Sequence, residues 1–218
     1  MSAALGTASL RVDGGARWVV PVVLLGGLAV VVATRWAGTR AGFDPLAVGA
    51  AFGLALGALA VGGRSFEAGL RGRVEPSVSG EAHSATSAMA IGIAFGLALV
   101  AIVIIGATVA GAQLVPGLGR PAAAFAPWVA ITILVAGAEE ALLRGRLFDA
   151  LRRAGGVLPA VVITTVAFAL IHVPLYGWHV VPLDLAVGLA FAGLRLATGS
   201  IAAPATAHAT ADLATWWL

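Results

Sequence analysis

The stretch that decides the fold runs from Ala124 to Arg144 and reads Ala-Phe-Ala-Pro-Trp-Val-Ala-Ile-Thr-Ile-Leu-Val-Ala-Gly-Ala-Glu-Glu-Ala-Leu-Leu-Arg. Its first part has the apolar character of a membrane-spanning helix, and two adjacent carboxylates, Glu139 and Glu140, follow directly. Each carboxylate costs about 2.5–3.5 kcal/mol in hydrocarbon on insertion scales. This cost predicts that the chain has a use for the two charges.

Helical geometry separates the roles of the two glutamates. Glu140 and Arg144 are four residues apart with the acid first, which is the favourable orientation for an ion pair. Glu139 is rotated by about 100° from Glu140, so it projects elsewhere and lacks an evident local partner. We therefore expect Glu140 and Arg144 to be structural and Glu139 to be free for chemistry.

The composition of the whole chain excludes an ordinary soluble domain. Of 218 residues, 60% are hydrophobic and 11% are charged, and the mean hydropathy is +1.01. Cysteine is absent, which excludes disulfides and thiolate metal sites. Every basic residue is arginine; with the abundant alanine and glycine, this indicates GC-rich bacterial coding. We attribute the arginines to membrane orientation and contact with the lipid bilayer, and expect no nucleic-acid partner.

Apolar runs of about 20 residues recur along the chain, and they predict an all-α, polytopic integral membrane helix bundle of about seven transmembrane helices. Residues 1–218 are expected to form a single membrane domain. A cleaved signal peptide at the N-terminus is the less favoured alternative, because the first run is long and lacks a convincing cleavage site. The expected spans are 18–32, 44–62, 85–110, 122–148, 158–173, 181–197 and 200–217.

Two stripes of small residues in the early spans predict close helix packing; they are Gly49, Gly53 and Gly57, and then Gly92 and Gly96. The one long polar connection, 63–84, contains His83, which we expect to be exposed. Arginines dominate the connections on the N-terminal side of the membrane, so the rule that cytoplasmic loops are positive places the N-terminus in the cytoplasm of a bacterial inner membrane.

Three spans carry ionisable residues in otherwise apolar surroundings. Besides Glu139, the fifth span contains His172, one turn after Phe168, and the seventh contains His208 and Asp212 at i and i+4 on one helix face. A lone histidine in a helix is more often a packing residue than a catalyst. Because intramembrane ionisable groups normally face the bundle interior and pair with one another, we expect these groups to converge on one polar site.

These residues resemble the three motifs of the CAAX protease and bacteriocin-processing (CPBP, or Abi) family of intramembrane proteases. The motifs are Glu139-Glu140-xxx-Arg144, Phe168-xxx-His172 and His208-xxx-Asp212, and Thr198-Gly199-Ser200-Ile201 resembles the approach to the last one. The third motif often ends in Asn, and Asp212 departs from it. The resemblance assigns 122–218 to a catalytic core and leaves 1–121 as N-terminal helices without family signal.

The resemblance implies hydrolysis of peptide bonds in membrane-associated peptides or proteins. Amide hydrolysis needs an activated water, a base and donors for the oxyanion. Glu139, next to His172, would be the base, and His208 with Asp212 would stabilise the developing negative charge. A competing version places zinc on Glu139, His172 and His208. Because the chain lacks an HExxH pattern, we favour the version without a cofactor.

The same ionisable residues could also serve a function other than catalysis. A proton-coupled transporter or a partner-binding scaffold would use the glutamate and histidines as a relay, but transporters usually show two related halves, and the chain shows no internal repeat. Asp184 and Arg195 bracket the sixth span as boundary charges, with substrate access as an alternative for Asp184. Helix lengths place His172 farther from the cytoplasmic end than Glu139 and His208, and the sequence offers no resolution of this mismatch.

Overall fold

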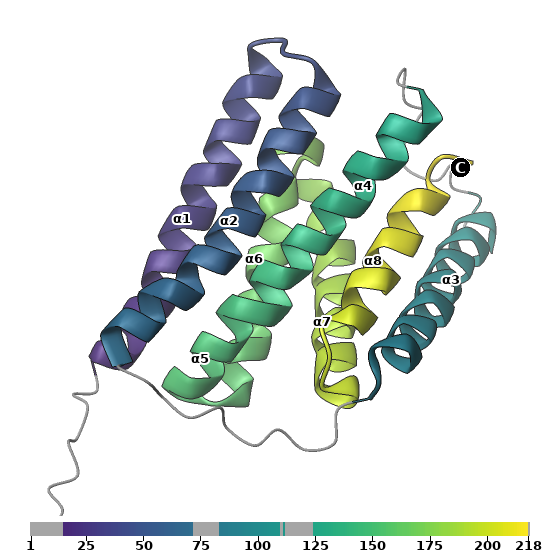
Figure 1. The fold of residues 1–218 in the computed structure, drawn as a ribbon. Coiled ribbons are helices and arrows are strands. Elements are labelled where there is room, and N and C mark those ends of the chain that lie inside the picture. Colours follow the sequence, from purple (N-terminus) through teal and green to yellow (C-terminus); the bar gives the residue numbers. More distant parts are fainter. Residues whose placement is uncertain (1–14, 72–82, 110, 112–123, 218) are drawn as a thin grey trace, which may run out of the picture.

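A computed structural model describes residues 15–71, 83–109, 111 and 124–217 of the chain. The described part is a bundle of helices (Figure 1). Predictions that concern the N-terminal arginine at 11, the polar stretch 72–82 and the turn 112–123 lie outside the described residues. The helices are α1 (Ala16–Arg40), α2 (Pro45–Arg71), α3 (Ala85–Val109), α4 (Phe125–Glu140), the π-helix η1 (Ala141–Leu147), α5 (Phe148–Gly155), α6 (Val157–Tyr176), the 3₁₀ turn η2 (Trp178–Val180), α7 (Val181–Thr198) and α8 (Ala202–Ala214).

The prediction of a polytopic all-α membrane bundle is confirmed. Among the described residues, six helical segments are long and apolar enough to cross a membrane, and they are Arg17–Arg40, Pro45–Phe66, Ala85–Val109, Phe125–Gly155, Val157–Tyr176 and Trp178–Thr198. The expected seventh span, 200–217, corresponds to α8. With 13 residues, α8 measures about 20 Å, which is shorter than the hydrocarbon core of a bilayer.

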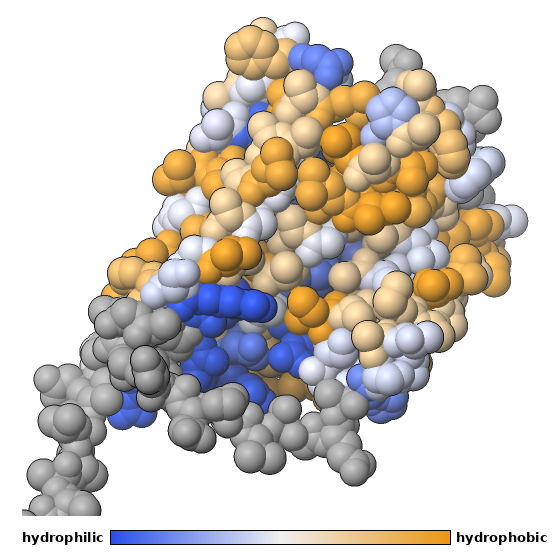
Figure 2. Space-filling model, in the orientation of Figure 1, coloured by the Kyte–Doolittle hydropathy of each residue, from blue (hydrophilic) through white to orange (hydrophobic). Residues whose placement is uncertain are grey.

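The surface of the bundle is suited to lipid rather than water. Figure 2 shows hydrophobic residues over much of the visible face and hydrophilic residues gathered near its lower end. Large apolar side chains such as Ile102, Leu158 and Leu97 are exposed, whereas the carboxylates of Glu139 and Glu140 are buried. The chain is therefore a multi-pass membrane protein whose charged groups are partly inside.

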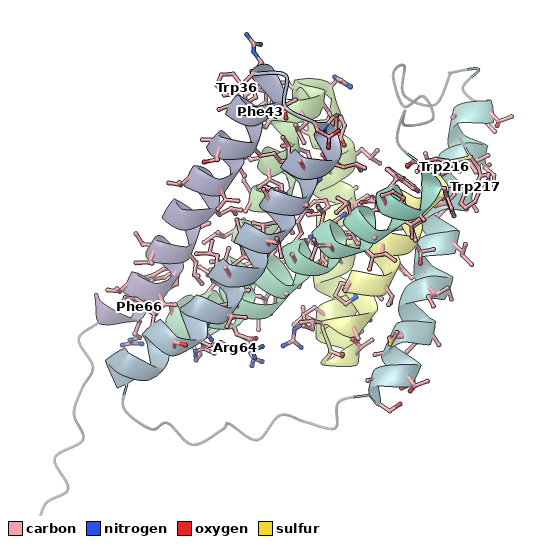
Figure 3. All side chains as sticks on the ribbon, turned by 45° about the horizontal axis from the view of Figure 1, so that its top comes forward. Trp36, Phe43, Arg64, Phe66, Trp216 and Trp217 are labelled. Atoms are coloured by element: carbon pink, nitrogen blue, oxygen red, sulfur yellow. The ribbon has the colours of Figure 1, made fainter. Side chains whose placement is uncertain are left out.

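The bundle has two chemically different ends. The start of α1, the end of α2, α5 and the end of α7 lie together at the lower end of Figure 1. We call this the arginine-rich end; its described arginines are Arg17, Arg64, Arg71, Arg146, Arg152, Arg153 and Arg195. The opposite end carries Arg35 and Arg40 together with the aromatic residues Trp36, Phe43, Trp216 and Trp217, which Figure 3 labels.

Several helix boundaries differ from the sequence-based ones. α1 continues to Arg40 rather than residue 32, and α2 continues to Arg71 rather than residue 62. In α1, Arg35 stays within the helix because its guanidinium lies 4.2 Å from the Phe52 ring centroid, where a cation–π contact stabilises the charge. The polar connection therefore begins later than predicted, and His83 within it is exposed, as predicted.

The fourth span is longer than predicted. Its length explains how Glu139 and His172 can lie at the same depth in the membrane. α4, η1 and α5 form one 31-residue segment that ends at Gly155, where Gly156 has a φ of 92° that favours glycine. Sixteen residues separate Glu139 from that turn, and fifteen residues of α6 lead from it to His172. At 1.5 Å per residue, both side chains lie about 22–24 Å from the turn.

Most glycines of the two stripes lie at close contacts between helices, as predicted. A Cβ atom at Gly49 or Gly53 of α2 would lie 2.9 Å from Ile131 or Leu134 of α4, whereas Gly57 has open space. In α3, a Cβ at Gly92 would meet the Ala203 carbonyl of α8. Such contacts hold α4 and α8 in the middle of the bundle, where both carry site residues.

The α3–α8 contact makes a first prediction. A Cβ at Gly96 would lie 2.6 Å from the Ala207 carbonyl oxygen, so we expect Gly96→Ala to force the helices apart and to cost about 1–3 kcal/mol. Gly106→Ala on the same helix is the matched control, because nothing lies within 4 Å of that Cβ. Thermal melting in detergent should show a lower Tm for Gly96→Ala only. An equal effect of both changes would contradict the close contact.

Candidate active site

The predicted ion pair between Glu140 and Arg144 is confirmed and lies at the centre of the bundle. Arg144 Nη1 donates to Glu140 Oε1 at 2.8 Å, and both side chains are fully buried. Arg144 Nη2 donates to the Gly188 carbonyl of α7 at 3.0 Å. The guanidinium therefore ties η1 to α7 while it neutralises Glu140.

Aromatic rings complete the surroundings of the arginine. The guanidinium carbon of Arg144 lies 4.5 Å from the ring centroid of Phe168 and 5.5 Å from that of Phe191. A Cβ at Gly188 would come within 3.3 Å of both Arg144 Nη2 and the Phe168 ring, so the absence of a side chain there lets α7 approach closely. Phe168, the first residue of the second motif, thus packs directly on the arginine of the first.

A π-helix follows the two glutamates. η1 covers Ala141–Leu147, and at its end the Phe148 N–H bonds to the carbonyls of Leu143 and Gly145 rather than to that of Arg144. The Arg144 carbonyl instead accepts from Arg195 Nε at 3.0 Å, and Arg195 Nη2 lies 3.3 Å from Asp149 Oδ1. Arg195, which we predicted to be a boundary charge, therefore holds the widened turn in place. Short π segments are frequent at functional sites.

Glu140 has a second partner that the sequence did not indicate. His208 Nδ1 lies 3.1 Å from Glu140 Oε1 and donates to it, so one carboxylate oxygen accepts from both Arg144 and His208. This hydrogen bond joins the first motif to the third across 68 residues of sequence. Glu140 is structural, as predicted, and it also fixes the orientation of the His208 ring.

Glu139 faces the other nitrogen of the same imidazole. Its side chain is 2% exposed, and among the described residues its Oε2 atom has no hydrogen-bond partner. His208 Nε2 lies 3.9 Å from Glu139 Oε2 and 3.4 Å from Asp212 Oδ2. A separation of 3.9 Å is too long for a direct hydrogen bond and suits a bridging water.

His172 lies on the other side of Phe168 from the glutamates. Its Nδ1 donates to the Phe168 carbonyl at 2.8 Å, which leaves Nε2 as the acceptor nitrogen in the neutral ring. The ring of Phe168 contacts both imidazoles, with centroid distances of 4.8 Å to His172 and 5.3 Å to His208. Among the described residues, no hydrogen bond joins His172 to Glu139, and the carboxylate near His172 is that of Asp184.

Sequence reasoning missed part of this second cluster. Asp184 Oδ2 lies 3.6 Å from His172 Nδ1, and Tyr176 stacks on the His172 ring with centroids 6.1 Å apart. The clue in the sequence was an acid at the start of an apolar run, which we took for a boundary charge. Tyr176, the single tyrosine of the chain, lies one helical turn after His172, and that spacing could have indicated the contact.

The donor set does not form a metal site as it is arranged. Zinc bound by Glu139, His172 and His208 would require these three side chains to converge on one ion. Among the described residues, no group of three or more His, Cys, Asp or Glu side chains is placed to hold a metal ion. We therefore derive no step through zinc.

One of the comparisons with known proteins gives a match. Residues 121–214 match the family model described as type II CAAX prenyl endopeptidase Rce1-like. This match confirms the family resemblance of the second half of the chain. Its bounds agree closely with the region that the three motifs cover. No curated protein and no solved structure matches the chain.

The ion pair between Glu140 and Arg144 leads to a prediction about stability. Removing one partner of a buried ion pair leaves an uncompensated charge at a cost of about 3–5 kcal/mol. We expect Glu140→Gln and Arg144→Ala each to lower the Tm strongly in detergent. The double variant should lose less than the sum of the two single losses, because the second change removes the stranded charge.

Glu139→Gln is the matched control for these variants, one residue away and equally buried. Among the described residues, its Oε2 atom has no hydrogen-bond partner that the substitution could remove. We therefore expect the Tm of Glu139→Gln to be unchanged or higher. If Glu139→Gln unfolds the protein while Glu140→Gln is stable, the roles of the two glutamates are the reverse of those assigned here.

Proposed function

We propose that the chain hydrolyses peptide bonds in membrane-associated peptides or proteins, with a water activated by Glu139. The observation that carries this proposal is the buried Glu139 Oε2 atom, which has no hydrogen-bond partner among the described residues and lies 3.9 Å from His208 Nε2. Buried polar atoms normally have a partner. A water between these two atoms would supply it and would also be the nucleophile.

The proposed reaction assigns one role to each group. Glu139 accepts a proton from the water, and the resulting hydroxide attacks the carbonyl carbon of the peptide bond. In its protonated form, His208 donates from Nδ1 to Glu140 and points Nε2–H toward Asp212 and the oxyanion. The proton held by Glu139 then passes to the leaving amine nitrogen as the carbon–nitrogen bond breaks. Every proton taken from the water is thus returned to a product.

His172 and Asp212 complete the proposed site. The Phe168 carbonyl holds the Nδ1–H form of His172, so that its Nε2 can accept a hydrogen bond from the water or from the peptide N–H. Asp212 Oδ2 lies 3.4 Å from His208 Nε2 and would orient the protonated ring. Glu140, Arg144 and Phe168 support the site without touching the substrate.

The substrate and location are proposals as well. The family description names prenyl endopeptidases, and we propose a membrane-associated polypeptide as the substrate, of which a prenylated C-terminus and a bacteriocin-like peptide are two examples. We propose the bacterial inner membrane as the location, with the N-terminus in the cytoplasm. The seven described arginines at one end of the bundle, against two at the other, support this orientation.

Substitutions of Glu139 and of the histidines test the proposal. We expect Glu139→Gln, His208→Gln and His172→Gln each to lower kcat/KM by at least about 100-fold, the scale of general acid–base catalysis, while the Tm of Glu139→Gln is retained. The controls are His83→Gln and His179→Gln, two histidines outside the site, which should retain full rates. The assay is cleavage of a library of membrane-anchored peptides, read by mass spectrometry. Full cleavage by Glu139→Gln would contradict the role of Glu139 as the base, whereas absence of cleavage by the unaltered protein would favour a transporter or a scaffold instead.

A metal measurement tests the mechanism separately. Protein purified without chelator should contain less than one zinc per chain by elemental analysis, and mild chelation should leave cleavage unchanged. A stoichiometric zinc ion that resists chelation and is lost in Glu139→Gln would overturn the mechanism without a metal, while leaving the protease function in place.

A further inference from the structure

Arg35 is a charged residue within the membrane-spanning part of α1, and the proposed reaction does not use it. Among the described residues, no carboxylate lies within the ion-pair distance of 4.0 Å from its guanidinium. An ionisable residue inside a membrane span normally pairs with another charged group or marks a functional site. The described part of the chain therefore supplies a cation at this position without supplying its anion.

The guanidinium of Arg35 packs inside the bundle. Long basic side chains near the end of a span often extend to the lipid headgroups, and Arg40 in the last turn of α1 is exposed. The guanidinium carbon of Arg35 instead lies 4.2 Å from the ring centroid of Phe52 in α2. Because Phe52 is 3% exposed, a cation that packs on its ring is directed toward the interior rather than toward the headgroups.

Arg35 lies at the same depth as two residues of the candidate site. A Cβ at Gly155 would lie 3.1 Å from the Trp18 ring, so the start of α1 is level with the turn between α5 and α6. Seventeen residues lead from Trp18 to Arg35, which at 1.5 Å per residue is about 26 Å. Glu139 and His172 lie about 22–24 Å from the same turn.

The charge of Arg35 also acts on the candidate site. It interacts electrostatically with the Glu139 carboxylate of α4 and with the Tyr176 hydroxyl of α6. α1 contacts both α2 and α6, beside which it lies in Figure 1. Arg35 is therefore next to the proposed base, yet too far from it for a direct ion pair.

We propose that Arg35 is a specificity-determining residue that binds the C-terminal carboxylate of the polypeptide substrate. A planar guanidinium matches a carboxylate through two parallel hydrogen bonds. A carboxylate at the end of a chain can reach a cation packed inside a bundle, whereas an Asp or Glu side chain would bring the continuing backbone with it.

This inference rests on the proposed function for the cleavage itself, and it narrows the class of substrate. The polypeptide would be cut close to its C-terminus, since Arg35 and Glu139 lie at the same depth and interact electrostatically. The released fragment would keep the carboxylate that Arg35 binds. A polypeptide whose C-terminus is blocked, or lies far from the cleaved bond, would lose this contact.

Matched peptides test the inference. The probe is a prenylated peptide with a free C-terminal carboxylate, and its counterpart is the same peptide with a C-terminal amide. Cleavage of both is measured as kcat/KM for the unaltered protein, Arg35→Gln, Arg35→Lys and Arg40→Gln. The last variant is the matched control, because it removes an exposed arginine of the same helix. If Arg35→Gln does not fold, Arg35→Lys takes its place.

We expect the unaltered protein and Arg40→Gln to prefer the carboxylate peptide by at least about 10-fold, the scale of a hydrogen bond to a charged group, mainly through KM. Arg35→Gln should cleave the carboxylate peptide more slowly and the amide peptide at the normal rate, and Arg35→Lys should keep part of the preference. Equal losses for both peptides in Arg35→Gln would indicate a structural role and overturn the inference. A preference that survives in Arg35→Gln, or that is absent from the unaltered protein, would overturn it too.

A lipid phosphate is the other anion that a guanidinium could bind in a membrane. Phosphatidylglycerol added to the detergent-solubilised protein provides the test. If it raises the Tm of the unaltered protein but not that of Arg35→Gln, while the two peptides are cleaved equally well, Arg35 binds a headgroup and the inference is overturned.

Peptide binding separates this inference from the proposed function. The affinities of the two peptides, each labelled with a fluorophore, are measured by anisotropy on Glu139→Gln and on the double variant with Arg35→Gln. Tighter binding of the carboxylate peptide that depends on Arg35 would support the inference even if the unaltered protein cleaves neither peptide, and that outcome would contradict the proposed function only. Equal affinity for both peptides, or binding of neither, would overturn the inference.

Discussion

The structure depends on one buried carboxylate oxygen. Glu140 Oε1 accepts from Arg144 at 2.8 Å and from His208 at 3.1 Å, deep in a bundle where an unpaired charge is costly. Through Arg144 this oxygen is connected to the Gly188 carbonyl of α7 and to the Phe168 ring of α6. Five helical segments, α4, η1, α6, α7 and α8, therefore take their relative positions from a single charge that must be satisfied.

The two adjacent glutamates show how such a network leaves one group available. Through its Oε1 atom, Glu140 holds the end of α4 to η1 and α8, and this fixes the His208 ring with Nε2 directed toward Glu139 and Asp212. Glu139 is nearly as buried, and its Oε2 atom lacks a hydrogen-bond partner within the described residues, as does Oε2 of Glu140. A carboxylate held in this way is costly for stability, and it is what a general base in a protected site requires.

Spacing along a single helix predicted the contacts that a single helix can make. The pairs Glu140–Arg144 and His208–Asp212 follow from i, i+4 geometry, and the glycines of α3 predicted close helix packing, although not that the partner would be α8. Contacts between helices, such as Glu140 with His208 and His172 with Asp184, depend on how each helix is rotated, and no periodicity contains that information. The π-helix was also missed, because an ideal helical repeat does not foresee a widened turn. The same assumption of regular helices with the predicted bounds placed Glu139 beside His172. It also left unexplained how these two side chains could lie at the same depth in the membrane.

Direct observation of the space between Glu139 and His208 tests the central claim most sharply. An experimental structure at a resolution that shows waters, of active protein purified without chelator, should contain one water within hydrogen-bond distance, about 2.6–3.2 Å, of both Glu139 Oε2 and His208 Nε2. Density for a metal ion bound by Glu139 and both imidazoles would contradict the account. So would a Glu139 side chain that turns away from His208 toward lipid.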